Sequence, residues 1–409
     1  MSGESFRFLH AGDFSLETPL GDLDAVAPSM RSDLIAAPRT AASAVFDAAL
    51  SENVDFLMLS GNLLSPAAAG PHGMSLVIDG LSRLAEKNKP VFWTTGKSDD
   101  TAKWPDAVPL PKNVHLFSKS AAELVPVVRG GRTICTVTGR SADGNAAFSP
   151  AGYDVETTDH FSVAVGHGQV DASALSVTPF DHWCLGGRSQ HMILELPGQD
   201  SADAANRTTA AYCGSPQSRS IQQTGPHGYL VVDVDADRTR RVHHVATDVF
   251  RYVDHPVDAA TIASAGSLKN LLGSTIAKLQ SDGGGRHLIV RFDVRIARAD
   301  DMSLVGDIDT VLDDLRRDHG GGNPGTWVAS IDVSGPAEFP KSWRDEDTIL
   351  GDFLRATTSL ETSGGLDLSP LTEEQTIPET LASRLVRSEP ARLRDATLMG
   401  VRMLRGEAV

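Results

Sequence analysis

Short apolar runs alternate with stretches of helical spacing along the first hundred residues. The runs within 6–15, 54–60 and 90–95 predict buried strands, and the apolar positions of 33–52 and 74–88 predict helices between them. Continuous apolar strands that alternate with helices are typical of a mainly parallel sheet with right-handed crossovers, covered on both faces. We therefore expect three strand ends to meet at one edge of this sheet.

After residue 113 the pattern changes to short strands separated by Gly, Pro, Asp and Ser. These strands predict a second sheet that packs against the first. The segment 197–209 is polar and rich in small residues, which is typical of an exposed loop. The predicted strands are 114–117, 124–128, 132–138, 161–166, 182–185, 191–196, 229–235 and 240–246.

From about residue 255 helix and strand alternate again, which predicts a small α+β domain, and the last 60 residues are predicted to be helical. The helices are expected near 258–280 and 303–317, and the strands at 287–296 and 327–333. An interrupted apolar stripe follows Pro378, and it either packs on its own chain or docks on a partner helix. Its members are Leu381, Leu385, Leu393, Leu398, Val401 and Leu404. The predicted domains are thus 1–250, 255–340 and a helical tail, 341–409.

The charge of the chain bears on its partners. The 409 residues carry a formal net charge of -16, whereas proteins that bind nucleic acid through phosphates gain affinity from Lys and Arg. The charge therefore argues against DNA binding. One local basic cluster is either a small binding patch or an exposed strand edge with solvated charges; it comprises Arg238, Arg240, Arg241, His243 and His244.

Targeting and redox signals are few. No apolar run approaches about 18 residues, and no basic segment followed by a hydrophobic one begins the chain, so we expect no membrane partner and a cytoplasmic location. Cys135, Cys184 and Cys213 are widely spaced and form no CxxC pair. We interpret them as core thiols.

Six short motifs follow predicted strands, and they carry a resemblance to a known family. Their order, spacing and strand context over about 250 residues resemble the calcineurin-like metallophosphoesterases, in particular the SbcD and YhaO type of DNA repair exonuclease. The resemblance implies an α/β fold, a four-layer α/β/β/α sandwich with an appended C-terminal domain, and a two-metal site, usually manganese, at the strand ends. The motifs are His10-Ala11-Gly12-Asp13-Phe14-Ser15, Gly61-Asn62, Gly96-Lys97-Ser98-Asp99, Gly166-His167-Gly168, Leu185-Gly186-Gly187-Arg188-Ser189 and Cys213-Gly214-Ser215-Pro216-Gln217.

The motifs depart from the family pattern at most metal-ligand positions. Asp13 is kept, but Ser15 replaces the histidine of the first motif, and Asn62 replaces the carboxylate that bridges the metals. In the third motif Lys97 and Ser98 replace a metal-binding Asn and a catalytic His. The fourth motif keeps His167, whereas the last has lost both histidines in Gly186-Gly187-Arg188-Ser189. Of the seven usual ligands, the resemblance leaves Asp13 and His167.

These losses bear on two-metal catalysis, which needs ions about 3.5 to 4 Å apart held by enough anionic and imidazole ligands. Without the bridging carboxylate their repulsion is uncompensated. A Lys97 ammonium at a ligand position would repel a divalent ion by about 4 kcal/mol per unit charge at 4 Å, for an effective dielectric of about 20. We therefore expect Lys97 to exclude metal, and Ser98 cannot replace a titrating histidine near neutral pH.

Three arrangements of the crevice remain open. Asp13 pairs with Lys97 or Arg188 as a structural ion pair; or Lys97 and Arg188 form a metal-free anion site with backbone amides of the glycine turns; or Asp13, Asn62 and His167 retain weak metal binding.

Two further motif residues have simpler interpretations. His10 is interpreted as a core or loop-positioning residue, and Asp99 as a turn residue that accepts hydrogen bonds from nearby amides.

The expected function is non-enzymatic. The chain is predicted to be a degenerate metallophosphoesterase that acts as a scaffold or regulatory partner, without a cofactor. The resemblance implies a coiled-coil ATPase as the partner, with the C-terminal helices as the first candidate contact. The alternative is an active phosphoesterase or exonuclease in DNA repair that uses manganese at a non-standard site.

Overall fold

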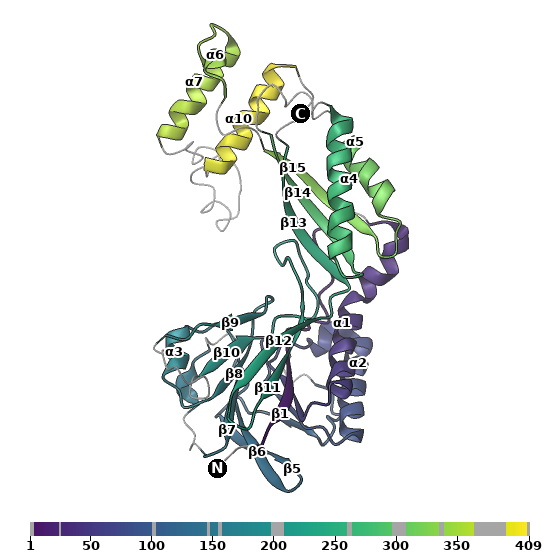
Figure 1. Cartoon of the computed structure of the whole chain (residues 1–409), viewed down its shortest axis with the longest axis vertical. Helices are drawn as coiled ribbons and strands as arrows, with labels where there is room; N and C mark the ends of the chain where they lie inside the picture. The colour runs from purple at the N-terminus through teal and green to yellow at the C-terminus, as the bar shows by residue number, and fades with distance from the viewer. Residues whose placement is uncertain are drawn as a thin grey trace. The chain divides into compact units, whose positions relative to one another are not determined.

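The computed structural model describes residues 4–23, 26–99, 104–144, 148–153, 158–197, 208–259, 264–296, 308–334, 339–363 and 390–406. The chain divides into two compact units (Figure 1). Unit 1 is Met1–Tyr252 with Arg286–Leu288, and unit 2 is Val253–Gly285 with Ile289–Val409. Within the described ranges, no helix has both the length and the apolar character needed to cross a bilayer.

The first sheet of unit 1 has the order β12-β11-β1-β2-β3-β4. Strands β1 to β4 run parallel, and β11 runs antiparallel to both β1 and β12. The mainly parallel sheet predicted from the apolar runs is therefore present. Its strands are β1 (Phe6–Ala11), β2 (Phe56–Leu59), β3 (Val91–Trp93), β4 (Val114–Leu116), β11 (Gly228–Val234) and β12 (Arg240–Ala246).

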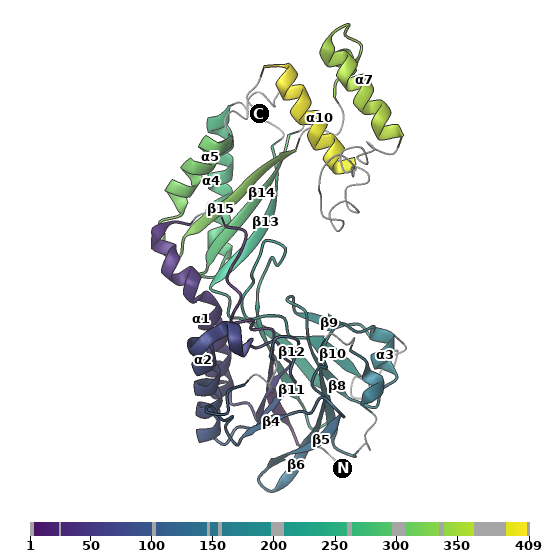
Figure 2. The same ribbon diagram turned by 180° about the vertical axis from the view of Figure 1, so that it is seen from behind.

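Helices α1 (Arg31–Ser51) and α2 (Pro66–Glu86) cover one face of this sheet (Figure 2). Leu57 and Trp93 of the sheet share one buried core with Phe46 of α1 and Leu81 of α2. α2 begins eight residues before the predicted helix. Gly70-Pro71 is a pair that usually ends a helix, but here it lies inside α2. Gly70 has a φ of 64°, so it forms a kink between two helical segments rather than an end.

The second sheet has the order β5-β6-β7-β8-β10-β9. Its residues Val137 and Val163 share a buried core with Phe8 and Phe56 of the first sheet, so the predicted packing of two sheets is present. The four-residue strand β10 was not predicted. It begins at Thr209, the last residue of the predicted loop 197–209. Residues 198–207 of that loop lie outside the described ranges. The strands are β5 (Glu123–Arg129), β6 (Arg132–Gly139), β7 (Phe161–His167), β8 (His182–Gly186), β9 (Met192–Leu194) and β10 (Thr209–Tyr212), and a short helix α3 (Ala172–Ser176) follows β7.

Unit 2 contains a three-stranded sheet of order β13-β14-β15 with two helices. The prediction of a helix from about 258 is wrong, because residues 250–258 form a strand and the helix begins at Ala265 after a capping box made by Ser264 and Ser267. The elements are β13 (Phe250–Asp258), β14 (His287–Arg295), β15 (Thr326–Ser334), α4 (Ala265–Asp282) and α5 (Ile308–His319).

The C-terminal region of unit 2 contains α6 (Lys341–Arg344), α7 (Ile349–Thr362) and α10 (Pro390–Leu404), and α7 contacts α10. Leu393, Leu398 and Val401 of the predicted stripe are buried, whereas Leu404 is 43% exposed. The stripe therefore packs largely on its own chain. Leu381 and Leu385 lie outside the described residues.

Candidate functional site

The candidate site lies where the strands of both sheets in unit 1 end. Backbone hydrogen bonds join these ends: the Asp13 N–H donates to the Gly61 carbonyl at 2.8 Å, and the Gly168 N–H donates to the Gly186 carbonyl at 3.0 Å. Asp13 follows β1, Gly61 follows β2, Gly168 follows β7 and Gly186 ends β8. The convergence at the carboxyl ends is the one expected for parallel strands.

Asp13 is 8% exposed and is held by two neutral donors. The Asn62 side-chain amide donates to Oδ1 at 3.0 Å, and the Gly187 N–H donates to Oδ2 at 2.7 Å. Burial raises the pKa of Asp13 to about 6, although the charge of His167 and the hydrogen bonds from Gly187 and Asn62 oppose the rise. The carboxyl group therefore titrates close to neutral pH.

Asn62 is the centre of the hydrogen-bond network. Its Oδ1 accepts from the Lys97 N–H at 2.8 Å, the Ser98 N–H at 3.1 Å and the Ser98 hydroxyl at 3.2 Å. Because Nδ2 is committed to Asp13, both ends of the amide have protein partners. Asn62 thus joins the turn after β1 to the turn after β3 by hydrogen bonds.

Asp99 holds the turn after β3 in place by hydrogen bonds. Its carboxylate accepts from the backbone N–H groups of Gly96, Asn62 and Leu63 and from the indole N–H of Trp93. Burial raises the pKa of Asp99 above its ordinary value, and these donors oppose the rise. Asp99 has the turn-bonding role expected from the sequence.

His167 lies at the end of β7, where it is 7% exposed. Its Nδ1–H donates to the Ser60 carbonyl at 2.7 Å, so Nε2 is the ring nitrogen that remains for another partner. His10 lies in the core, with Nε2 at 3.0 Å from the Ser60 hydroxyl. Burial and the nearby His182 lower the pKa of His10 to about 3, so it is neutral.

The two cations predicted for the crevice do not pair with Asp13 in the described part of the chain. Lys97 is exposed, and its contact to the network is through its backbone N–H. Arg188 is half-buried, with its guanidinium carbon 4.9 Å from the centre of the Tyr212 ring. Of the three arrangements left open, the ion pair of Asp13 is therefore not observed, and Asn62 and Gly187 hold the carboxylate instead. The exposed Lys97 does not support the expectation that its ammonium excludes metal from the crevice.

Three residues of the site adopt a backbone conformation that is uncommon for non-glycine residues. The φ angles of Asp13, Ser15 and Asn62 are 51°, 44° and 55°. Such conformations cost about 1 to 3 kcal/mol each and persist only where the surroundings impose them, and they concentrate at functional sites. The turns of this site are thus held in a specific geometry.

The donor set does not fit a two-metal centre. Across the ranges that the structure describes, no group of three or more His, Cys, Asp or Glu side chains is arranged to hold a metal ion. Asn62 directs its amide N–H₂ toward Asp13, and its oxygen already accepts three hydrogen bonds, so it offers no free ligand at the bridging position. Asp13 and His167 alone supply too few ligands to offset the repulsion between two divalent ions.

The basic cluster after residue 237 is mostly paired with carboxylates. Arg238 contacts Asp181 at 2.5 Å, Arg241 contacts Asp235 at 2.8 Å, and His243 lies 3.8 Å from Asp233. The contacts favour the interpretation of an exposed strand edge over that of a phosphate-binding patch.

Two polar features of unit 1 were missed from the sequence. Arg219 donates to the carbonyls of Phe14 and Gln217, at 2.5 and 3.0 Å, and so ties the turn after β1 to the segment after β10; burial lowers its pKa to about 10. In the sequence, the Gly214-Ser215-Pro216-Gln217 motif just before Arg219 was the signal that could have pointed to this contact.

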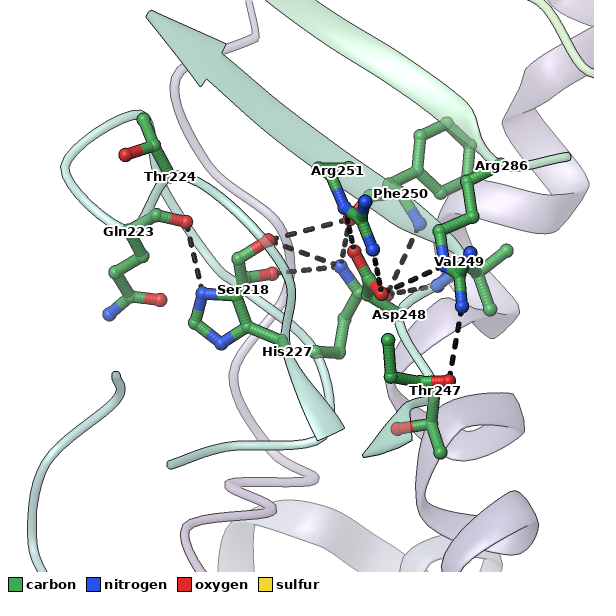
Figure 3. Close-up of polar contacts among 12 residues, drawn as sticks. Ser218, Gln223, Thr224, His227, Thr247, Asp248, Val249, Phe250, Arg251 and Arg286 are labelled. Atoms are coloured by element: carbon green, nitrogen blue, oxygen red, sulfur yellow. Dashed lines mark hydrogen bonds and ion pairs between the residues drawn. The ribbon is translucent and has the colours of Figure 1, made fainter. Parts of the chain in front are cut away.

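In the second feature, Asp248 lies between Arg251 and Arg286 (Figure 3).

The Asp248 side chain is fully buried, with Arg251 at 2.8 Å and Arg286 at 2.9 Å. Figure 3 shows both guanidinium groups directed at its carboxylate. Arg251 lies just before the chain enters unit 2 and Arg286 begins the segment that returns to unit 1. Asp248 therefore fixes both connecting segments at their bases.

One comparison supports a phosphoesterase-like class for this mixed α/β chain. The chain is 24% identical over 290 residues, which are 68% of this chain and 69% of the other, to a metallophosphoesterase. That protein is YhaO of Bacillus subtilis (strain 168), described as uncharacterized. No family model matches the chain. The distant similarity agrees with the mixed α/β architecture and supports a relationship to metallophosphoesterases.

Proposed function

We propose that this protein is a metallophosphoesterase of the SbcD and YhaO type that has lost two-metal catalysis and acts as a scaffold or regulatory partner in the cytoplasm. The proposal includes the four-layer α/β/β/α sandwich with a small C-terminal α+β domain and a helical tail. The observation that carries it is the position of Asn62: a neutral amide spans the turns that a bridging carboxylate and its metals would otherwise join.

Hydrolysis assays test the loss of catalysis. We expect no turnover of a generic phosphodiester, or of blunt double-stranded DNA ends, above that of an Asp13→Ala/His167→Ala variant when manganese is added. Turnover in the wild-type chain that requires both residues would refute the proposal. It would support the alternative, which is an active exonuclease in DNA repair with a non-standard manganese site.

The partner that we propose is a coiled-coil ATPase, with the C-terminal helices as the first candidate contact. In α10, Met399 and Met403 are 52% and 63% exposed, one turn apart. Substituting both by Glu is expected to reduce recovery of partners in a pull-down, whereas Ile35→Glu, at an exposed apolar position of α1, is not. Equal recovery with all three chains would remove α10 from consideration.

A further inference from the structure

The lysines of this acidic chain are concentrated in one stretch of the sequence. Between residues 87 and 119 there are six lysines, three aspartates and no arginine, whereas the rest of the chain contains three lysines. The segment begins directly after α2 and contains strands β3 and β4. It therefore has a local positive charge on a chain of net charge -16. The six lysines are Lys87, Lys89, Lys97, Lys103, Lys112 and Lys119.

An open groove of about 550 Å³ lies in this region between β4 and β5, and we call it the edge groove. Its floor is apolar and includes Phe92, Val125 and Val127, while Lys112 and His115 contribute polar groups. None of the described residues that line it is acidic, although the Glu123 carboxylate lies 3.1 Å from His115 Nε2. The volume is within the range of about 300 to 1,000 Å³ that is usual for ligand sites.

The edge groove lies along strands that end their sheets. β4 ends the first sheet and β5 ends the second (Figure 2). An edge strand presents unpaired N–H and C=O groups on its open side. β5 is protected against pairing by Pro126, which has no N–H, and by an irregular register between Val127 and Val128. β4 has neither device, but it is only three residues long, and its Val114 N–H already donates to the Pro111 carbonyl at 3.1 Å.

The charges beside β4 are available to a partner. Lys87 and Lys112 are exposed, and in the described part of the chain neither has an ion pair. Lys89 differs, because its ammonium donates to the Val54 carbonyl at 2.6 Å. An extended segment along β4 would thus meet a main-chain edge, an apolar floor and two unpaired cations.

We infer that the edge groove binds an extended acidic peptide that carries apolar residues and adds to the open edge of β4 as a further strand. Main-chain hydrogen bonds to the edge supply affinity, alternate apolar side chains of the peptide enter the floor at Phe92, and its carboxylates face Lys87 and Lys112. The inference is independent of the crevice, because none of the groove residues belongs to that site.

Fluorescence anisotropy tests the inference with a labelled ten-residue peptide of alternating Glu and Val. We expect the full chain to bind it, with weaker binding when salt is raised from about 50 to about 300 mM, because exposed charges are screened. A Lys87→Glu/Lys112→Glu variant should bind about tenfold or more weakly. Lys278→Glu, at an exposed position of α4, is the matched control and should bind as wild type.

Two further probes separate the components of the binding. Replacing Glu by Lys in the peptide should abolish binding, and N-methylation of alternate backbone nitrogens should weaken it, because the strand then lacks its donors. Hydrogen exchange should show peptide-dependent protection at β4. Failure to bind up to about 1 mM, equal binding by the charge-reversal variant and its control, or protection elsewhere would overturn the inference. Protection of β4 that rises with protein concentration alone would assign the groove to a second copy, which also overturns it.

Discussion

Replacing Asn62 by Asp tests whether a hydrogen-bonded amide has taken over the bridging position. The substitution keeps the acceptor for the Lys97 and Ser98 N–H groups but removes the donor to Asp13. A carboxylate oxygen then faces the Asp13 carboxylate at the present 3.0 Å separation. We expect Asn62→Asp to destabilise the protein and to make its stability depend on pH.

The magnitude follows from the distance and from the pKa of Asp13. Two unit charges 3 Å apart repel by about 5 kcal/mol at an effective dielectric of about 20. The pair avoids most of this cost by sharing one proton, and at pH 7 protonating a group of pKa about 6 costs about 1.4 kcal/mol. The loss in unfolding free energy should therefore be about 1 to 3 kcal/mol at pH 7. The pKa of the shared proton is raised in the folded state, so the loss should grow as the pH rises through it and shrink toward pH 5.

Urea unfolding at pH 5.5, 7 and 8 measures this dependence. Asn53→Asp is the matched control, because Asn53 is exposed and has a similar φ of 51°. Manganese should raise the melting temperature of Asn62→Asp, since the new carboxylate, Asp13 and His167 provide three ligands, but should leave the wild-type chain unchanged. An Asn62→Asp protein with the stability of the control at pH 8, or equal stabilisation of both proteins by manganese, would refute the reasoning.

Three further predictions concern stability, each measured by chemical unfolding. Burial lowers the pKa of His10 to about 3, so below about pH 6.5 only the unfolded state takes up a proton on His10 and the folded protein loses stability as the pH falls. His10→Gln should therefore reduce the dependence of the unfolding free energy on pH by up to about 1.4 kcal/mol per pH unit between pH 6.5 and 4.5. An unchanged dependence would contradict the conclusion that His10 is buried and neutral. Asp248→Asn should cost about 3 to 5 kcal/mol because two half-buried guanidinium groups lose their counter-charge, whereas Asp235→Asn, at an exposed pair, should cost less than about 1 kcal/mol. A Cβ at Gly186 would lie 2.0 Å from the Ser60 carbonyl oxygen, so Gly186→Ala should cost about 3 kcal/mol or more. Gly21→Ala, whose nearest contact is 3.5 Å, should change stability by less than about 1 kcal/mol, and equal effects would count against the close packing of the two strand ends.

The strands and helices that rest on long apolar patterns were predictable, and those that depend on tertiary pairing were not. β10 consists of Thr209-Ala210-Ala211-Tyr212, whose small residues give no strand signal by themselves. It is a strand because β8 and β9 flank it. Similarly, Pro256 in β13 argues against a strand, yet β13 forms at the edge of a three-stranded sheet, where a missing N–H is tolerated.

The candidate site was predictable in position but not in its contacts. Motif order placed Asp13, Asn62 and His167 at converging strand ends, because parallel strands end at the same edge. The partner of Asp13 was not predictable, since the Gly187 N–H comes from the turn after β8 of the other sheet, 174 residues away. The exposure of Lys97 was also beyond the pattern, because it depends on the turn that Asn62 and Asp99 hold by hydrogen bonds.

Manganese stoichiometry of the purified chain tests the central claim most directly. After equilibrium dialysis against manganese at neutral pH, we expect less than one tightly bound ion per chain, and the same value for Asp13→Ala/His167→Ala. Two bound ions per wild-type chain, lost in that variant, would contradict the proposal that Asn62 and its hydrogen bonds stand in place of a metal centre.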